Sequence, residues 1–186
     1  MSDTELDDDV YTRFLAVPPD KVAEIIHGGL VTHPRPAVRH AAAASALGAE
    51  IYGPFRRGKG GPGGWVILDE PELRLGPDIL VPDLAGWRRE RMPTMPDTAA
   101  IHLAPDWICE VLSPATEAID RADKLPIYAA NNVTHTWLVD PTTKTLEVFK
   151  LITQHWTLLA TYRDDAKVRA EPFDAIELEL NVMWEG

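Results

Sequence analysis

Short runs of aliphatic, β-branched and aromatic residues recur along most of the chain, and glycine, proline or charged residues close each run. This pattern is typical of β-strands separated by turns. Between Lys21 and His33 two such runs flank His27, Gly28 and Gly29, which predicts a hairpin. The further predicted strands lie at 65–68, 72–75, 79–87, 106–112, 134–140, 144–151, 155–162 and 167–170, and a last strand-like run follows within 172–184.

Two segments have helical patterns instead. Residues 36–52 are rich in alanine, the best helix former, and begin with a proline that suits a first helical turn. Residues 123–131 have Asp123 as a candidate N-cap and Pro126 in the first turn, where its missing N–H costs least. Many strands and two helices together predict an α/β (α+β) domain built on a mixed sheet.

Residues 58–64 contain five glycines in seven positions. A phosphate-binding P-loop would need Gly-Lys-Ser/Thr at the start of a helix, and none follows here. The segment is therefore interpreted as a flexible loop. Residues 88–105 are rich in proline and charge and are expected to be irregular.

The composition is that of an ordinary globular protein, since 45% of the 186 residues are hydrophobic and 25% are charged. The length suits a single domain, expected at residues 16–186. The first ten residues carry five acids and no base, so residues 1–15 are expected to form a solvated, frayed acidic tail. Eighteen Lys and Arg stand against 29 Asp and Glu, a net charge of −11, which excludes DNA binding by bulk charge.

The single cysteine, Cys109, excludes an intrachain disulfide and a zinc site built from cysteines. No stretch has the ~20 apolar residues of a membrane span, and the acidic N-terminus does not look like a secretory signal. The sequence thus predicts a cytoplasmic protein with no membrane partner.

Two acids lie inside otherwise apolar strand segments: Asp83 in ILVPDLAGW and Glu110 in DWICEVL. A lone buried carboxylate is costly and needs a partner or a shifted pKa. If the two strands are neighbours, both acids can share a magnesium ion, which prefers oxygen ligands; the alternative is that one acid pairs with an arginine or caps a turn. Asp78 also follows a proline, but in a turn context where Pro-Asp is common, so Asp83 is the preferred candidate.

The order of these parts resembles the Uma-type restriction-endonuclease family, bacterial members of the PD-(D/E)XK nuclease superfamily. The similarity extends from about Val22 to Pro141, and EVLSP with the Asp, Lys and Tyr that follow it is its most specific part. The matching segments are AEIIHGGLV with PRPAVRH, VPDLAGW, WICEVLSPATEAIDRADKLPIYAANNV and THTWLVDP. The resemblance implies a restriction-endonuclease-like core with flanking helices.

By position, the resemblance implies that Asp83 and Glu110 bind a divalent metal, Mg²⁺ or alternatively Mn²⁺. The superfamily lysine normally stands two residues after the glutamate, where this chain has Leu112. The resemblance implies that Lys124, on the following helix, takes that catalytic role. Glu24 matches an acid of the first hairpin and is a candidate third metal ligand, or else a solvated strand residue.

His40 matches a family histidine at the start of the first helix, and it either contacts substrate phosphate or makes a hydrogen bond in the core. Asp120 and Arg121 also match family positions, but a surface ion pair is the preferred interpretation for them. Tyr128 is expected to pack in the core, and Ser113 to cap a turn, because no nucleophile elbow surrounds it. Cys109 alternates with Glu110 and should face the opposite, buried side of its strand.

Basic residues form two groups beside the irregular segments. The groups are Arg56, Arg57 and Lys59, and Arg88, Arg89 and Arg91. Arg88 and Arg89 are the candidates for substrate binding, although arginines placed for solubility explain the pattern equally well.

The sequence thus predicts a magnesium-dependent endonuclease that hydrolyses DNA phosphodiester bonds. A homodimer with two sites would suit cleavage of both strands. One alternative is an inactive nuclease-fold module that binds nucleic acid or a protein partner, favoured by Leu112 and the net charge of −11. The other is a metal-dependent hydrolase of a small phosphorylated substrate.

Overall fold

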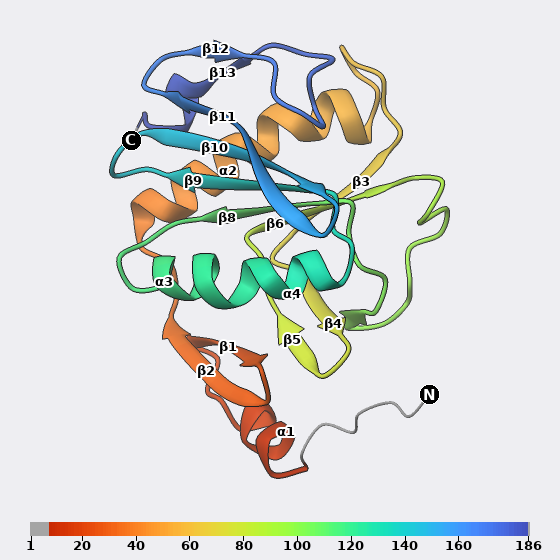
Figure 1. Ribbon diagram of the computed structural model, residues 1–186, viewed down its shortest axis with the longest axis vertical. Helices are drawn as coiled ribbons and strands as arrows, with labels where there is room; N and C mark the ends of the chain where they lie inside the picture. The colour runs from red at the N-terminus through yellow and green to blue at the C-terminus, as the bar shows by residue number, and fades with distance from the viewer. Residues whose placement is uncertain (1–7, 186) are drawn as a thin grey trace.

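The computed structural model describes residues 8–185, which form two mixed sheets, a small two-stranded sheet and flanking helices (Figure 1). The helices are α1 (Asp8–Leu15), α2 (Val38–Ile51), α3 (Glu117–Ile119) and α4 (Leu125–Ala130), with π-helical turns η1 (Tyr52–Arg56) and η2 (Asp120–Lys124) and a 3₁₀ turn η3 (Leu180–Met183). The first seven strands are β1 (Lys21–Ile26), β2 (Gly29–Pro34), β3 (Trp65–Asp69), β4 (Glu72–Leu75), β5 (Asp78–Leu80), β6 (Leu84–Arg88) and β7 (Ala100–Ile101). The remaining strands are β8 (Trp107–Val111), β9 (His135–Asp140), β10 (Thr145–Ile152), β11 (His155–Arg163), β12 (Lys167–Val168) and β13 (Leu178–Glu179).

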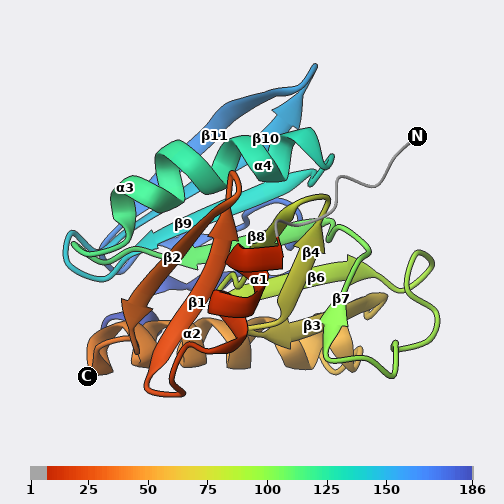
Figure 2. The same cartoon turned by 90° about the horizontal axis from the view of Figure 1, so that it is seen from below.

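The central sheet has six strands in the order β11-β10-β9-β8-β6-β3. Its pairs are antiparallel except for β8 and β9, which run parallel and are joined through the α3–η2–α4 segment. Helix α2 covers one face, and α3 to α4 lie on the other (Figures 1 and 2). Side chains of β8 point alternately to the two faces of the sheet, so they belong to two hydrophobic clusters. Trp107, Cys109 and Val111 pack on the α2 side, while Ile108 packs on the α4 side. Cys109 is buried on the face opposite Glu110, as predicted.

The second sheet has the order β2-β1-β5-β4-β7. It begins with the predicted hairpin, whose turn uses positive φ at His27 and Gly28. The β1–β2 hairpin projects beside the central sheet and brings its residues close to α3 and to the start of α2 (Figure 2). This placement brings the Glu24 carboxylate within hydrogen-bond distance of the Val81 N–H and of Lys124 Nζ.

Several predicted boundaries are wrong. The strand expected at 79–87 is two strands in different sheets, β5 and β6, because Pro82 lacks an N–H and the Asp83 carboxylate hydrogen-bonds outside the ladder. The helix expected from Asp123 begins at Glu117, so Asp123 is not its N-cap. The strand expected at 167–170 is only β12, which pairs with β13 apart from the central sheet.

The acidic tail expected at residues 1–15 is corrected in part. Residues 8–15 form helix α1, and Arg74 of β4 contacts it through the ring and hydroxyl of Tyr11. Residues 1–7 lie outside the described part of the chain. Within residues 8–185, no helix is both long and apolar enough to cross a bilayer.

Candidate active site

Asp83 and Glu110 lie side by side, because the two strands are neighbours, which is the condition that the sequence set for a shared metal ion. Strands β6 and β8 are antiparallel with Leu84 opposite Cys109, so the residue before Leu84 faces the residue after Cys109. Asp83 Oδ2 accepts a hydrogen bond from the Val111 N–H at 2.7 Å, which fixes its carboxylate at the end of β8. The interruption between strands β5 and β6 at Pro82 and Asp83 therefore places a carboxylate at this edge of the central sheet.

Lys124 reaches the same place from the α4 side of the sheet. Its Nζ lies 2.8 Å from Glu110 Oε1, 3.1 Å from Glu24 Oε1 and 3.4 Å from Asp120 Oδ1. Leu112 packs in the core on the α4 side with only 4% of its surface exposed. The lysine that is missing after Glu110 is thus supplied by the π-helical turn η2, and π-turns are frequent at functional sites.

The helical segment between β8 and β9 has a π-helical turn just before Pro126. Pro126, at the start of α4, has no N–H to continue an α-helical ladder. Asp120 and Lys124 are four residues apart in η2, so they lie on the same side of the helical segment, and both side chains are buried.

Glu24 lies opposite Glu110 across the ammonium group. Its Oε1 accepts the Val81 N–H at 2.8 Å, and its Oε2 lies 3.4 Å from His33 Nε2. Both oxygens of Glu24 thus have partners from the protein. Glu24 thus holds Lys124, and its role as a third metal ligand stays a prediction.

Tyr128 completes the network from helix α4. Its hydroxyl donates to Glu110 Oε1 at 2.7 Å, and the side chain is fully buried. The predicted core position of Tyr128 is confirmed, whereas its hydrogen bond to Glu110 was not predicted. Glu110 Oε1 therefore accepts from both Tyr128 and Lys124.

Burial and neighbouring charges shift the pKa values of this cluster. Burial raises the pKa of Glu110 well above its usual range, although Lys124 opposes the shift. Burial would lower the pKa of Lys124, but Glu110 and Glu24 together raise it well above its usual range. Burial would also raise the pKa of Glu24, yet Lys124, His33 and the Val81 N–H lower it to about 2. The ammonium is therefore the charge that holds the acids together.

His40 contacts Asp83 from the first turn of α2. Its Nε2 lies 3.3 Å from Asp83 Oδ2, while Nδ1 is buried with no hydrogen-bond partner among the described residues. Burial would lower the pKa of His40, but Asp83 raises it above its usual value. Of the two roles that the sequence left open for His40, this placement shows a contact with a buried acid, and contact with a substrate phosphate stays a prediction.

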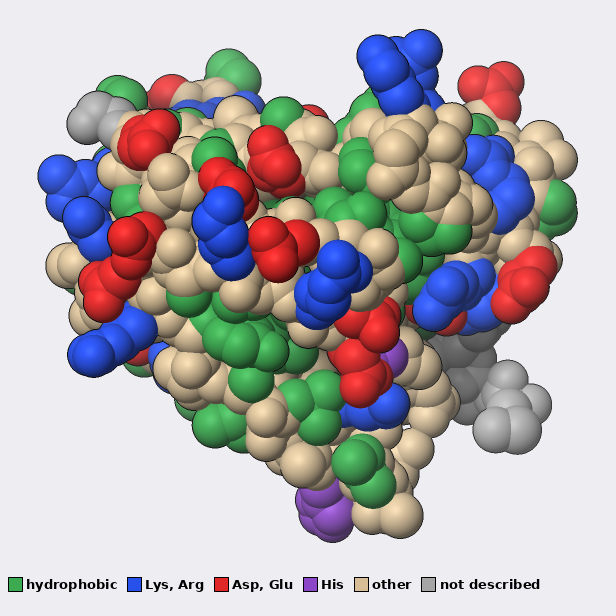
Figure 3. Space-filling view, turned by 90° about the horizontal axis from the view of Figure 1, so that it is seen from above, with side chains coloured by type: hydrophobic (Ala, Val, Ile, Leu, Met, Phe, Trp, Pro, Cys, Tyr) green, Lys and Arg blue, Asp and Glu red, His purple; other side chains and the backbone are tan. Residues whose placement is uncertain are grey.

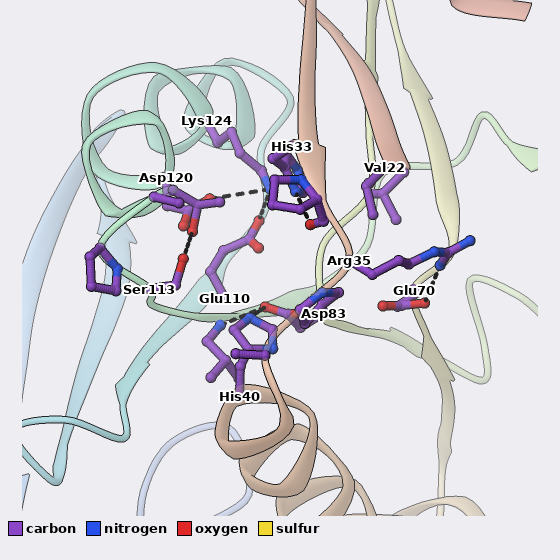
Figure 4. A pocket seen from close by; sticks show the side chains of 18 residues that line it. Val22, His33, Arg35, His40, Glu70, Asp83, Glu110, Ser113, Asp120 and Lys124 are labelled. Carbon is purple, nitrogen blue, oxygen red and sulfur yellow. Dashed lines mark hydrogen bonds and ion pairs between the residues drawn. The ribbon is translucent and has the colours of Figure 1, made fainter. Parts of the chain in front are cut away.

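Asp83, Glu110, Lys124, Asp120, His33 and His40 line one pocket of about 330 Å³, while Glu24 and Tyr128 lie behind its lining. Figure 4 shows Glu110 and Lys124 on one side of it, Asp83 and His40 on another, and His33 and Arg35 from the hairpin facing them. Glu110 and Lys124 are each only 3% exposed, and Asp83 is 14% exposed. The acids therefore lie on the floor of the pocket rather than on an open surface.

Arg88 and Arg89 do not belong to this pocket. They lie at and beyond the far end of β6, about 16 Å (Arg88) and about 20 Å (Arg89) from Asp83 at about 3.3 Å per strand residue. Arg88 instead stacks over the Trp65 ring, 4.2 Å from its centre. On the face shown in Figure 3, basic and acidic side chains alternate and form no continuous basic track. The interpretation of Arg88 and Arg89 as substrate-binding residues is therefore not supported by their position.

Three other candidate residues, Asp78, Ser113 and Arg121, make local contacts that explain their positions. Asp78 accepts the His27 N–H at 2.6 Å and closes the hairpin turn, so it is not part of the pocket. Ser113 Oγ lies 3.0 Å from Thr116 Oγ1, in agreement with the predicted role in a turn. Arg121 pairs with Glu117 and Glu147 near the surface, as predicted.

Three site residues were missed or misread in the sequence. Asp120, expected in a surface ion pair, is 4% exposed and joins the Lys124 cluster. Tyr128 and His33 had no recognised role. A signal for Asp120 was present: its four-residue spacing from Lys124 places the two on one helical side. Nothing in the local sequence indicates His33, because its partner Glu24 lies across a hairpin.

A divalent cation fits two of these acids. Within residues 8–185, no group of three or more His, Cys, Asp and Glu is arranged to hold a metal by itself. Asp83 and Glu110 each use one oxygen in the recorded contacts of the described residues, which leaves the other oxygen of each for a ligand. Mg²⁺ is commonly held by one or two carboxylates together with water and substrate phosphate, so this donor set suits it.

Comparison with known proteins agrees with the sequence resemblance. A crystal structure from Anabaena variabilis, described as "a putative nuclease belonging to DUF820", is similar in fold, with a TM-score of 0.75 and 22% sequence identity over 94% of this chain and 97% of that chain. No curated protein matches the chain at a significant level. The sequence model of the Uma2 family, described as "Putative restriction endonuclease", matches residues 9–183. Because this match spans nearly the whole chain, the protein belongs to the Uma2 family.

Proposed function

We propose that the chain is a metal-dependent endonuclease that hydrolyses DNA phosphodiester bonds at the pocket of Asp83, Glu110 and Lys124. The observation that carries the proposal is the position of Lys124 Nζ, 2.8 Å from Glu110 Oε1. It supplies a cation beside the acid pair although the chain has Leu112 at the usual position of the lysine. The family description agrees with this class of reaction.

Asp83 and Glu110 would hold the metal ion. Bound there, a divalent cation supplies Lewis acidity for a water molecule and positive charge for the phosphate oxygens. Lys124 stabilises negative charge on the phosphoryl group and orients the attacking water. The water oxygen forms a bond to phosphorus as the bond from phosphorus to one ester oxygen breaks. One water proton ends on the leaving oxygen, which gives a phosphate end and a hydroxyl end.

Glu24 and Tyr128 hold this arrangement together. Glu24 fixes the ammonium at 3.1 Å, and Tyr128 holds Glu110 Oε1 at 2.7 Å. His40 contacts the other acid, Asp83, and its position also suits contact with a substrate phosphate. Each of these is a positioning role in the proposal, because the metal and the phosphate are to be bound by Asp83, Glu110 and Lys124.

A second candidate function is a nuclease-fold module that binds nucleic acid or protein without cutting it. The observation that favours it is the ammonium itself, because Lys124 already pairs with Glu110, one of the two acids that would hold a metal, as well as with Glu24 and Asp120. This candidate predicts that no divalent cation binds and that no phosphodiester is hydrolysed.

Calorimetric titration with Mg²⁺ and Mn²⁺ tests the proposal, using wild type, Glu110→Gln and Glu147→Gln. Glu147 is a matched control, because it pairs with Arg121 away from the acids of the pocket. We expect wild type and Glu147→Gln to bind the metal and to nick plasmid DNA in the same buffer, and Glu110→Gln to do neither. Absence of metal binding to wild type would favour the non-cutting module. Metal binding without hydrolysis of any phosphodiester would contradict the proposed reaction.

We also propose that the chain forms a homodimer, since two copies would carry two sites for the two DNA strands. Light scattering across micromolar concentrations tests it. A molar mass near twice that of one subunit is expected, and the mass of one subunit throughout would exclude the dimer.

A further inference from the structure

The depth of the pocket restricts how a phosphodiester can reach the acids. The side chains of Glu110 and Lys124 are each 3% exposed, and Asp120 is 5% exposed. A phosphate in a duplex lies on the outside of a broad cylinder whose bases are stacked and paired. Such a phosphate meets an open surface easily, but it cannot descend to a floor that is almost closed to solvent.

The size of the pocket matches a small ligand. Its volume of about 330 Å³ lies near the lower end of the range of about 300–1,000 Å³ for small-molecule sites. Beside its polar and charged residues, the lining includes a set of short apolar side chains, which are Val22, Pro34, Pro36, Ala37, Val81, Pro114 and Ala115. This lining suits the apolar faces of one sugar and base, with the phosphate directed to the polar floor.

The charges around the pocket argue against a duplex as well. Tight binding of duplex DNA comes from several Lys or Arg contacts to phosphates. The Lys and Arg side chains of the lining are Lys124, which is paired with carboxylates, and Arg35, which lies 3.8 Å from Glu70. The two histidines of the lining, His33 and His40, also face carboxylates, those of Glu24 and Asp83. The arginines of the β6 end, Arg88 and Arg89, are remote from it. A substrate that contacts few phosphates fits this distribution better than one that tracks a long backbone.

From these three observations we infer that the substrate enters as an unpaired DNA strand, one nucleotide at a time, and that intact duplex is excluded. The inference rests on the proposed nuclease function, which it deepens by naming the substrate class. Extracting a nucleotide from a duplex costs a few kcal/mol of pairing and stacking, and a strand that is already unpaired avoids this cost. The chain therefore selects single-stranded segments through the shape of its pocket.

Binding tests the inference without metal and without turnover. Glu110→Gln in EDTA is titrated into a labelled single-stranded oligonucleotide and into a hairpin duplex of the same sequence, and fluorescence anisotropy is measured. We expect the single strand to bind about tenfold more tightly or better, as the contribution of one base in a protein pocket implies. Equal affinity, a preference for the duplex, or no binding to either DNA would overturn the inference.

Two variants locate the binding in the pocket. Ala115 is exposed and lines the wall, whereas Ala130 is exposed at the end of α4 and does not line it. Ala115→Trp, combined with Glu110→Gln, should lose the single-strand affinity, while Ala130→Trp should keep it. Thermal unfolding confirms that both variants fold. If both bind the single strand as the parent does, the strand lies elsewhere and the inference is wrong.

Cleavage by wild type separates failure of this inference from failure of the proposed function. A circular single strand and a closed circular duplex of the same sequence are incubated with Mg²⁺. Cutting of the single strand alone supports the inference. Equal or faster cutting of the duplex keeps the nuclease and overturns the substrate class. Cutting of neither, with single-strand binding retained, rejects the nuclease and leaves a single-strand binding module.

Discussion

The ammonium group of Lys124 lies 2.8 Å from Glu110 Oε1 although the two residues come from a helical turn and a strand on different layers of the fold. The same nitrogen also contacts Glu24 and Asp120. One cation thus joins three elements around the acid pair of the pocket. The stability of this region and its affinity for metal are expected to depend on that single group.

Lys124→Met should destabilise the protein by about 3–5 kcal/mol at neutral pH, because it leaves buried carboxylates without their counter-charge. The loss should shrink as the pH falls, since the freed carboxylates then take up protons. Lys21→Met is the control, because Lys21 is exposed at the start of β1. Urea unfolding measures both. A midpoint for Lys124→Met equal to that of wild type would show that the acids are stable without the ammonium.

Tyr128→Phe removes one oxygen from the buried network. Its hydroxyl donates to Glu110 Oε1, and hydrogen bonds to charged groups contribute about 1.5–3 kcal/mol. We expect a loss of stability in that range and weaker Mg²⁺ binding, because Glu110 is then less well oriented. Tyr162→Phe provides the comparison, since within residues 8–185 no hydrogen bond is recorded for the Tyr162 hydroxyl. Unchanged Mg²⁺ affinity in Tyr128→Phe would limit this tyrosine to a packing role.

The free energy of unfolding should fall at acid pH because of the Glu24 carboxylate. Its pKa is lowered from 4.5 to about 2 in the folded chain, so between these values the unfolded chain binds a proton that the folded chain does not. The resulting stabilisation, about 3 kcal/mol from the linkage relation, is present above about pH 4.5 and is lost as the pH falls towards 2. Burial raises the pKa values of Glu110 and Asp120, which contribute with the opposite sign.

The difference in unfolding free energy between wild type and Glu24→Gln isolates this contribution. Glutamine keeps an acceptor for the Val81 N–H but carries no charge. The difference should be largest near neutral pH and should decrease steadily below pH 4.5. A difference that does not change with pH would mean that the charge of Glu24 is not what stabilises the fold.

Asp83 has a structural contact and a proposed metal contact, and two variants separate them. Asp83→Asn keeps an oxygen to accept the Val111 N–H and should fold with nearly wild-type stability. Asp83→Ala leaves that N–H unpaired and should lose about 1–3 kcal/mol. Both variants should lose Mg²⁺ binding in calorimetric titration. Retention of full metal affinity by Asp83→Asn would remove Asp83 from the proposed ligands.

Arg88→Ala tests the placement of the remote arginines. Arg88 stacks on Trp65 at the far end of β6, so its loss should cost about 0.5–1 kcal/mol of stability. Mg²⁺ affinity and the rate of DNA hydrolysis should be unchanged. A marked fall in hydrolysis would show that DNA reaches this end of the sheet and that the sequence interpretation of Arg88 was correct.

The strand and turn pattern predicted most of the central sheet, because alternating apolar residues and turn glycines act through neighbours in the chain. The α2 helix, the first hairpin and strands β8 to β11 were found close to their observed bounds. The errors occurred where a proline or an ion pair competes with local propensity. Pro82 divides an apparently continuous strand, and the buried contacts of Asp120 and Lys124 extend a helix beyond the expected start.

The residue pattern of the sequence by itself identified the two acids, because a charge in an apolar strand needs a partner wherever it is buried, and the resemblance supplied the lysine and the family. Only the tertiary structure decided which charges meet. Glu24 and His33 come from a hairpin, Glu110 from the central sheet, and Lys124 and Tyr128 from the opposite helical layer. Contacts between layers depend on packing angles and distances of a few ångströms, which chain spacing does not encode. For the same reason, the burial of the acids at the floor of the pocket and the remoteness of Arg88 became apparent only once the sheets were packed.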